Sequence, residues 1–238
     1  MNISIQKAAA RGAADYGWLK ARYYFSFSNY HNPKQIHFGA LRVLNDDIIA
    51  GGGGFPTHPH DNMEIVTIPH SGAIAHRDTT GGSGTIMAGD VQIMSAGSGV
   101  QHSEKNASET EASNLFQLWV FPKVKNIKPR YDQRTFNVDD RINKWQVVVS
   151  PLEKDGALWI NQDAVFSLTK LEAGNTLAYE NSFTGNGVYL VVINGTVTIN
   201  DSTLEKRDAA GITGSDRFTI TATADAELLA VEVPMQIP

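Results

Sequence analysis

Short apolar segments that alternate with polar residues recur at intervals of about ten residues along most of the chain. Examples are residues 64–68, 115–121 and 188–193, and the pair Asn194-Gly195 that follows the last of them is a strong hairpin signal. A period of two is typical of half-buried β-strands, whereas the helical period of 3.6 is nearly absent. The pattern therefore predicts an all-β sandwich or barrel with few short helices.

Two segments near the N-terminus need their own interpretation. Residues 38–50 read as a hairpin, with Asn45-Asp46-Asp47 as its turn. Residues 16–30 are dense in aromatic side chains. Aromatic residues dominate the packing energy of protein cores, and a pocket uses few of them. We therefore expect these aromatic residues to fill the core rather than to form the wall of a substrate pocket.

The predicted strands fall into two groups that look like copies of one architecture. Between them, residues 123–141 are polar and have no sustained period, so we interpret them as a linker or crossover. This predicts an N-terminal domain at residues 1–122 and a second domain at residues 142–238. A chain of 238 residues is long enough for two such domains. No histidine follows His102, so we expect the second domain to lack metal ligands.

Potential metal ligands gather at both ends of the segment 57–104. His58 and His60 are two residues apart, and so are His102 and Glu104. Side chains two residues apart on a strand point to the same face. The intervening residues read as a meander of short strands, which can bring its two ends together as neighbours. The sequence therefore predicts a site of three imidazoles and one carboxylate, which suits a divalent first-row metal with open positions.

Three other histidines lie in loop-like sequence and are expected to be solvated, namely His31, His37 and His70. His76 lies within a predicted strand. We interpret it as a strand histidine hydrogen-bonded to a neighbour, and as a weaker candidate for lining the site.

Composition and charge narrow the classes of function. The formal net charge is −5 and the 20 Lys and Arg residues are scattered, so charge gives no indication of a nucleic-acid-binding surface. The absence of cysteine excludes disulfides and thiolate chemistry, and it fits a reducing compartment. No apolar run approaches the roughly 20 residues of a membrane span. We expect a cytoplasmic protein without a membrane or direct nucleic-acid partner.

A longer string of motifs resembles the pirin family of two-barrel cupins, or bicupins. The matching residues are Gly17-Trp18-Leu19-Lys20-Ala21-Arg22, Phe25-Ser26-Phe27, Phe38-Gly39-Ala40-Leu41-Arg42-Val43, His58-Pro59-His60, Glu64-Ile65-Val66-Thr67, His76-Arg77-Asp78, Gly89-Asp90-Val91-Gln92 and Gly99-Val100-Gln101-His102-Ser103-Glu104. The match covers residues 10–122, whereas the C-terminal half matches by architecture. The resemblance implies two facing cupin-type β-barrels, with one mononuclear iron site in the N-terminal one.

Carried onto this chain, the resemblance implies His58, His60, His102 and Glu104 as the metal ligands. Fe(II) is the expected ion, although Cu, Mn, Ni, Co and Zn also suit such donors. An ordinary cupin would use Glu64 as its carboxylate ligand. Here the resemblance favours Glu104, and we assign Glu64 the role of holding an imidazole N–H.

Some bacterial members that this chain resembles open the flavonol quercetin with dioxygen. The resemblance therefore implies a metal-dependent dioxygenase of the quercetin 2,3-dioxygenase type, with a flavonol-like aromatic and O2 as its substrates. Glu104 would be the catalytic base that takes the proton of the 3-hydroxyl group. A second hypothesis is a non-catalytic, metal- or redox-sensing partner of transcription factors or metabolic enzymes. A third is a small-molecule-binding cupin with a structural metal, although structural sites are usually closed and rich in cysteine.

Overall fold

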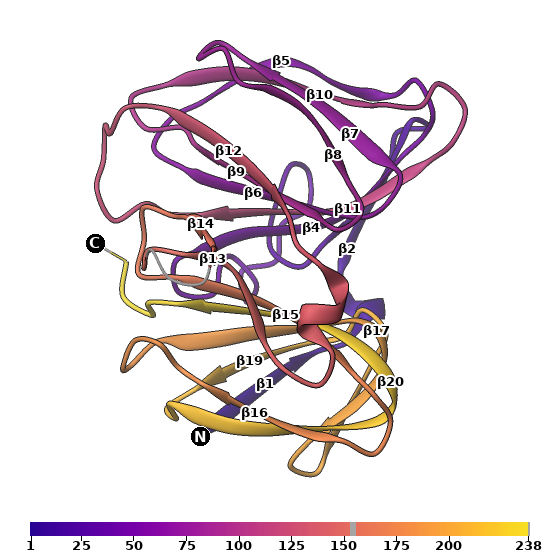
Figure 1. Cartoon of the computed structure of the whole chain (residues 1–238), viewed down its shortest axis with the longest axis vertical. Helices are drawn as coiled ribbons and strands as arrows, with labels where there is room; N and C mark the ends of the chain where they lie inside the picture. The colour runs from indigo at the N-terminus through magenta and orange to yellow at the C-terminus, as the bar shows by residue number, and fades with distance from the viewer. Residues whose placement is uncertain (153–155, 238) are drawn as a thin grey trace.

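The computed structural model describes residues 1–152 and 156–237, and nearly all regular structure in these ranges is β-strand. These ranges contain twenty strands and two short 3-10 helices, η1 (Ala8–Ala10) and η2 (Val138–Arg141). The strands form two stacked halves, which occupy the upper and lower parts of Figure 1. The predicted all-β class with few short helices is confirmed. Neither helix in the described ranges is long and apolar enough to cross a bilayer.

The upper half is a sandwich of two antiparallel sheets. Its large sheet has the order β12-β9-β6-β11-β4-β3-β2, and its small sheet has the order β5-β10-β7-β8. The large sheet contains β2 (Gly12–Asp15), β3 (Leu19–Tyr23), β4 (Leu41–Ile49), β6 (Glu64–Ser71), β9 (Asp90–Ser95), β11 (Ser113–Val120) and β12 (Arg130–Thr135). The small sheet contains β5 (Gly54–His60), β7 (Ala73–Asp78), β8 (Ser83–Met87) and β10 (Val100–Asn106). Ile49 and Leu115 of the large sheet share a buried apolar cluster with Ile74 of the small sheet, so the two sheets enclose a core.

The lower half is one nine-stranded sheet that curls around a core of its own. Its main path is β1-β19-β17-β20-β15-β13-β14, with β16 paired to β20 and β18 paired to β17. The strands are β1 (Asn2–Gln6), β13 (Gln146–Ser150), β14 (Leu158–Trp159), β15 (Val165–Leu171), β16 (Thr176–Glu180), β17 (Gly187–Ile199), β18 (Ser202–Glu205), β19 (Ala209–Thr213) and β20 (Arg217–Val233).

The two halves pack through one face of the large sheet of the upper half and one face of the single sheet of the lower half. One cluster of buried apolar residues joins Phe116 of the upper half to Phe166 and Val191 of the lower half. On β17, Val191 faces this interface, whereas Leu190 and Val192 face the interior of the lower half. A strand buried on both faces reads as a continuous apolar run, which explains the unbroken apolar sequence in β17.

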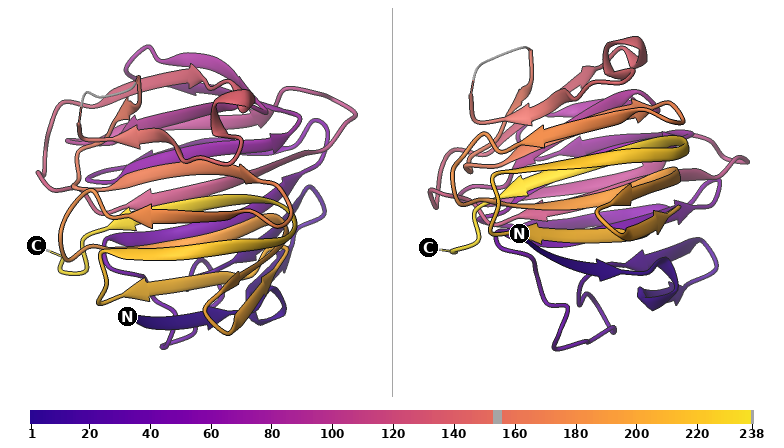
Figure 2. Two further views of the ribbon diagram at one scale, coloured as in Figure 1. Left: turned by 60° about the horizontal axis from the view of Figure 1, so that its bottom comes forward. Right: turned by 90° about the horizontal axis from the view of Figure 1, so that it is seen from below.

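Two strands do not follow the predicted domain limits. Strand β1 pairs with β19, so the first strand of the chain lies at the edge of the lower sheet (Figure 2). Strand β12, from the segment 123–141 interpreted as a linker, pairs with β9 in the upper half. The segment is therefore not a simple crossover, because its polar strand closes the edge of the upper large sheet. The division into domains at residues 1–122 and 142–238 stays a prediction, to which β1 and β12 are exceptions.

Candidate metal centre

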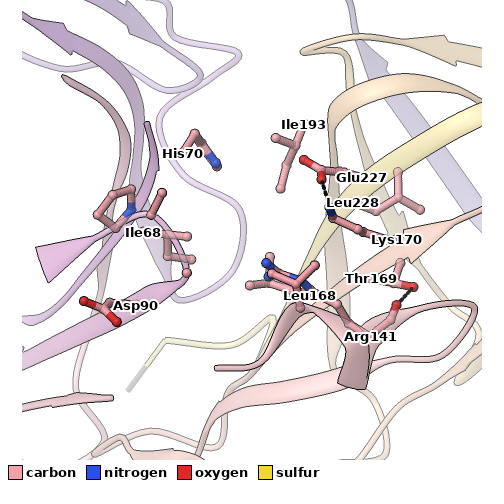
Figure 3. A pocket seen from close by; sticks show the side chains of 14 residues that line it. Ile68, His70, Asp90, Arg141, Leu168, Thr169, Lys170, Ile193, Glu227 and Leu228 are labelled. Carbon is pink, nitrogen blue, oxygen red and sulfur yellow. Dashed lines mark hydrogen bonds and ion pairs between the residues drawn. The ribbon is translucent and has the colours of Figure 1, made fainter. Parts of the chain in front are cut away.

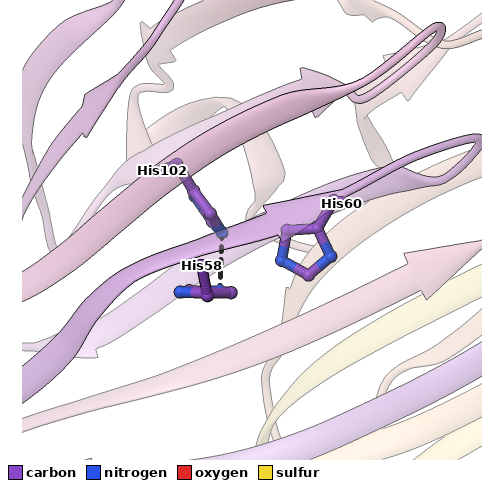
Figure 4. A group of neighbouring side chains, drawn as sticks. All are labelled: His58, His60 and His102. Atoms are coloured by element: carbon purple, nitrogen blue, oxygen red, sulfur yellow. Dashed lines mark hydrogen bonds between the residues drawn. The ribbon is translucent and has the colours of Figure 1, made fainter.

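The expected meeting of the two ends of the segment 57–104 occurs in the small sheet. Strand β10 lies between β5 and β7, and its register places His102 directly opposite His58. His58 and His60 project from the same face of β5 (Figure 4). One ring nitrogen from each of the three imidazoles lies within 4.8 Å of the other two. His102 Nε2 is 3.0 Å from His58 Nε2. The structure thus brings together three of the four predicted ligands in one group.

The three imidazoles suit a divalent metal. Two nitrogens bound to one ion at about 2.1 Å and at right angles would lie about 3.0 Å apart, as those of His58 and His102 do. His58 Nδ1 is 2.8 Å from the carbonyl oxygen of Pro56. Because that oxygen only accepts, Nδ1 carries the proton, and Nε2 is left with a free lone pair. His60 Nε2 is buried without a hydrogen-bond partner among the described residues.

Burial keeps two of these imidazoles neutral. It lowers the pKa of His60 to about 4 and that of His102 to about 3, and neighbouring histidines act in the same direction. A histidine binds a metal through the lone pair of its unprotonated nitrogen. Near neutral pH both side chains are therefore ready to act as ligands.

Glu104 lies deeper, on the same strand as His102. Its carboxylate accepts hydrogen bonds from Gln117 Nε2 at 2.9 Å and from Thr67 Oγ1 at 3.3 Å. It belongs to a second potential ligand group with His76 and His102, whose ligand atoms also lie within 4.8 Å of one another. His102 is common to both groups. The structure places Glu104 beside the three-histidine group, and its role as the fourth ligand stays a prediction.

A hydrogen-bond chain behind His102 fixes the orientation of its ring. His76 Nε2 is 2.9 Å from Asp78 Oδ2, and His76 Nδ1 is 3.5 Å from His102 Nδ1. The Asp78 carboxylate requires a proton on His76 Nε2, so His76 Nδ1 can accept from His102 Nδ1–H. That leaves the lone pair of His102 on Nε2, which faces His58. His76 also stacks on Tyr131, with ring centroids 4.5 Å apart. The interpretation of His76 as a strand histidine bonded to a neighbour is confirmed. The neighbour is Asp78, which belongs to a motif with His76 in the sequence but for which we predicted no role.

The assignment of Glu64 to an imidazole N–H is wrong. Its Oε2 accepts instead from Ser95 Oγ at 2.8 Å and from the backbone N–H of Asn161 in the lower half at 3.2 Å. The next residue, Ile65, packs in a cluster inside the upper half, so strand alternation turns Glu64 toward the interface. The alternation of β5 does not continue from His60 to Glu64, because Asn62, at a φ of 44°, turns the chain between the two strands.

The three histidines that we expected to be solvated differ in their exposure. His31 and His37 are exposed, as expected. His70 is not solvated, because its ring lies against Phe116 with centroids 4.3 Å apart and its Nε2 is buried. The loop-like sequence around Pro69 misled the prediction, because His70 is still part of β6.

A cavity of about 280 Å3 lies beside His58 within the upper half. Four aromatic side chains contribute to its mainly apolar walls, namely Tyr23, Phe27, Phe55 and Trp119. The expectation that residues 16–30 fill the core is confirmed for Tyr24 and Phe25, which are buried between the halves. It is incomplete for Tyr23 and Phe27, which also line this cavity.

Four polar side chains also line the cavity, namely Asn45, Asp47, Glu104 and Gln117. The predicted turn at Asn45-Asp46-Asp47 is wrong, because these residues lie within β4. Burial raises the pKa of Asp47 to about 8, with smaller contributions from Asp46 and Glu104, so near neutral pH its carboxyl group is mostly protonated. Its Oδ1 has no partner among the described residues. The spacing of two between Val43, Asn45, Asp47 and Ile49 was the available signal that Asp47 faces inward.

Comparisons with known proteins agree with this architecture. Residues 4–120 match the family described as Pirin, and residues 147–233 match the quercetinase C-terminal cupin domain. A pirin-like protein from Caulobacter vibrioides is 45% identical over 222 residues, which cover 93% of this chain and 95% of that protein. A quercetin 2,3-dioxygenase from Escherichia coli K12 is 41% identical over 236 residues, which cover 98% and 99% of the two chains. The crystal structure of the bacterial pirin YhhW from Escherichia coli in complex with nickel(II) matches with a TM-score of 0.92 and 39% identity, over 98% of this chain and 99% of that one.

Fold and site together define a protein of two cupin domains, with a histidine-rich candidate metal centre in the first. The donor set suits a single divalent metal ion. Given these relatives, the chain belongs to the pirin family.

Proposed function

We propose that this protein is a metal-dependent dioxygenase of the quercetin 2,3-dioxygenase type, which opens a flavonol-like aromatic with O2. The observation that carries the proposal is the position of the three-histidine group beside a cavity with aromatic walls. The name of the Escherichia coli relative supports it. His58, His60, His102 and Glu104 would hold the ion, for which we propose Fe(II). The bound metal would supply a Lewis acid for a substrate oxygen and a path for electrons to O2.

The residues of the cavity suit the other tasks of this reaction. The aromatic walls can bind a planar ring and exclude water. Without a bound metal, burial raises the pKa of Glu104, although His76 and the hydrogen bond from Gln117 oppose this, so its carboxylate takes up a proton more readily than an exposed one. Glu104 can therefore take the proton of a substrate hydroxyl while Gln117 and Thr67 hold it in place. Asp47 in its protonated form can donate a hydrogen bond to a second substrate oxygen.

The test is a single-turnover assay with metal-loaded protein and quercetin, mixed without oxygen and then exposed to it. We expect the flavonol absorbance to decay with the wild type and to decay about 100-fold or more slowly with Glu104→Gln. Thr57→Ala, an exposed change on the same strand as His58, serves as a control that should react normally. No decay with Fe, Ni, Mn, Co, Cu or Zn would exclude this function.

One observation supports the alternative of a non-catalytic metal- or redox-sensing partner protein. His60 also borders an open surface depression with Pro59, Asp61 and the segment 98–101, so metal binding can alter the outer surface. Capture of a protein partner by the metal-loaded form, and its loss on chelation without any turnover of quercetin, would favour this function. We further propose a cytoplasmic location, because a chain without cysteine suits a reducing compartment.

A further inference from the structure

A second cavity lies between the two halves, away from the metal centre. Its volume is about 240 Å3, and its walls come from the end of β6, the turn before β9, helix η2 and strands β15, β17 and β20. Much of its surface is apolar, including Ile68, Leu168, Ile193 and Leu228. Figure 3 shows side chains from both halves pointing into it.

Two polar groups of this cavity have no partner among the described residues. His70 Nε2 belongs to the upper half, and Arg141 Nε lies at the end of η2; both atoms are buried. In Figure 3 the two side chains approach the cavity from opposite walls. Within the described ranges, the Arg141 guanidinium makes neither an ion pair nor a hydrogen bond, although its backbone carbonyl accepts from Thr169 Oγ1.

The other charged groups of the cavity are already partnered. Lys170 and Glu227 form an ion pair of 3.0 Å. Asp90 accepts from the backbone N–H of Met87 and from Thr135 Oγ1. Neither carboxylate forms an ion pair with Arg141 among the described residues, although the charge of Glu227 attracts it. Burial lowers the pKa of Arg141, and the attraction of the Glu227 carboxylate offsets only part of this effect.

Arg141 Nε and His70 Nε2 are both buried, and a buried polar atom without a hydrogen-bond partner costs free energy. Native proteins rarely leave both in one cavity unless another molecule supplies the missing contacts. A carboxylate meets the requirement, because its two oxygens match the fork of an arginine and can also accept from an imidazole N–H. Burial lowers the pKa of His70 to about 3, so its ring is neutral and can donate from Nε2 in one tautomer.

We propose that this cavity binds a small organic monocarboxylate, held at its charged end by Arg141 and His70 and at its apolar end by Ile68, Leu168 and Ile193. Two features select this class. A dianion such as phosphate would bring excess negative charge close to Asp90 and Glu227, whereas a monoanion only balances Arg141. The cavity is also small, at about 240 Å3, so the ligand is short.

Calorimetric titration of the metal-loaded protein with benzoate tests this site. We expect binding that Arg141→Met weakens about 10–100-fold, because a charge-assisted contact is lost. Arg141→Lys keeps the charge but loses the forked N–H donors of the guanidinium. Its affinity for benzoate should therefore lie between those of the wild type and Arg141→Met. His70→Leu should weaken binding about 2–10-fold. Arg217→Met, a change of an exposed arginine on β20, is the matched control and should bind benzoate like the wild type.

Comparison ligands separate this site from the metal centre. Benzamide has the shape of benzoate without its charge and should bind at least about tenfold more weakly. Benzoate binding should persist after the metal is removed by chelation. Equal binding by Arg141→Met, stronger binding of inorganic phosphate, or binding that disappears on chelation would each overturn the proposal. Circular dichroism of each variant confirms that a loss of binding is not a loss of fold.

Discussion

At the residue scale, the candidate metal centre depends on where single protons reside. Pro56 fixes the tautomer of His58 through its carbonyl, and Asp78 fixes that of His102 through His76. Both hydrogen-bond arrangements leave a lone pair on the Nε2 atom that faces the other imidazole. Residues that never touch the ion therefore decide whether the histidines can bind it.

Asp78→Asn tests this chain of hydrogen bonds. Asp78 Oδ1 accepts from the backbone N–H groups of Thr80 and Gly82, so the asparagine oxygen can preserve the loop while its NH2 group turns toward His76. His76 would then carry its proton on Nδ1, where it opposes the N–H of His102. We expect metal affinity to fall about 10–100-fold in a competition titration, with little change in the circular dichroism spectrum. Asp201→Asn, at an exposed turn, is the control, and an unchanged affinity in Asp78→Asn would refute the tautomer argument.

At the element scale, strand alternation made much of the site predictable. The period of two placed His58 beside His60, and the meander brought β10 to β5, so the meeting of three imidazoles followed from the sequence. Alternation failed across the turn at Asn62, so it did not predict the direction in which Glu64 points. At Asp47 alternation continues along β4, but we predicted a turn, because a polar residue inside a barrel has the same sequence appearance as one in a turn. Contacts such as that of Asp78 with His76 depend on side-chain rotamers, which periodicity does not specify.

The close approach of β5 to β10 can be tested at Gly54. A Cβ added there would meet Glu104 O and Lys105 Cα, each at 2.6 Å, and backbone atoms cannot move aside cheaply. Gly54→Ala should therefore push β5 away from β10 and disturb the register that sets His58 opposite His102. We expect a loss of about 1–3 kcal/mol in the free energy of unfolding, measured in urea, and weaker metal binding. Thr57→Ala on the same strand should change neither, and a fully stable Gly54→Ala variant would show that the two strands are less tightly constrained.

At the scale of the whole molecule, the two halves are joined by more than their apolar contact. Strand β1 precedes the upper half in sequence yet completes the lower sheet, so the chain crosses the interface at its start as well as after β12. Glu64 is one of several polar links across this contact, which also include the ion pair of Arg207 with Asp46 at 3.3 Å. It accepts a hydrogen bond from the backbone N–H of Asn161 in the lower half. It is completely buried, and its Oε1 has no partner among the described residues. A charge at this position therefore acts on the association of the two halves.

The pH dependence of stability should reveal this group. Burial raises the pKa of Glu64 from its usual 4.5 to about 7, against the opposing hydrogen bonds from Ser95 and Asn161. The folded protein therefore holds this proton more tightly than the unfolded chain does. The resulting stabilisation is complete below pH 4.5, declines as the pH rises toward 7, and is lost above it.

Glu64→Gln resembles the protonated side chain at every pH. We expect it to unfold at the same urea concentration as the wild type near pH 4.5 and to be more stable by about 2–3 kcal/mol near pH 8. Other titrating groups act equally on both proteins, so the difference between their profiles isolates Glu64. Metal affinity should not change, because the side chain faces away from the three imidazoles. Parallel stability profiles of the two proteins would contradict the raised pKa of Glu64. A loss of metal binding would indicate that Glu64 is a metal ligand, as in an ordinary cupin.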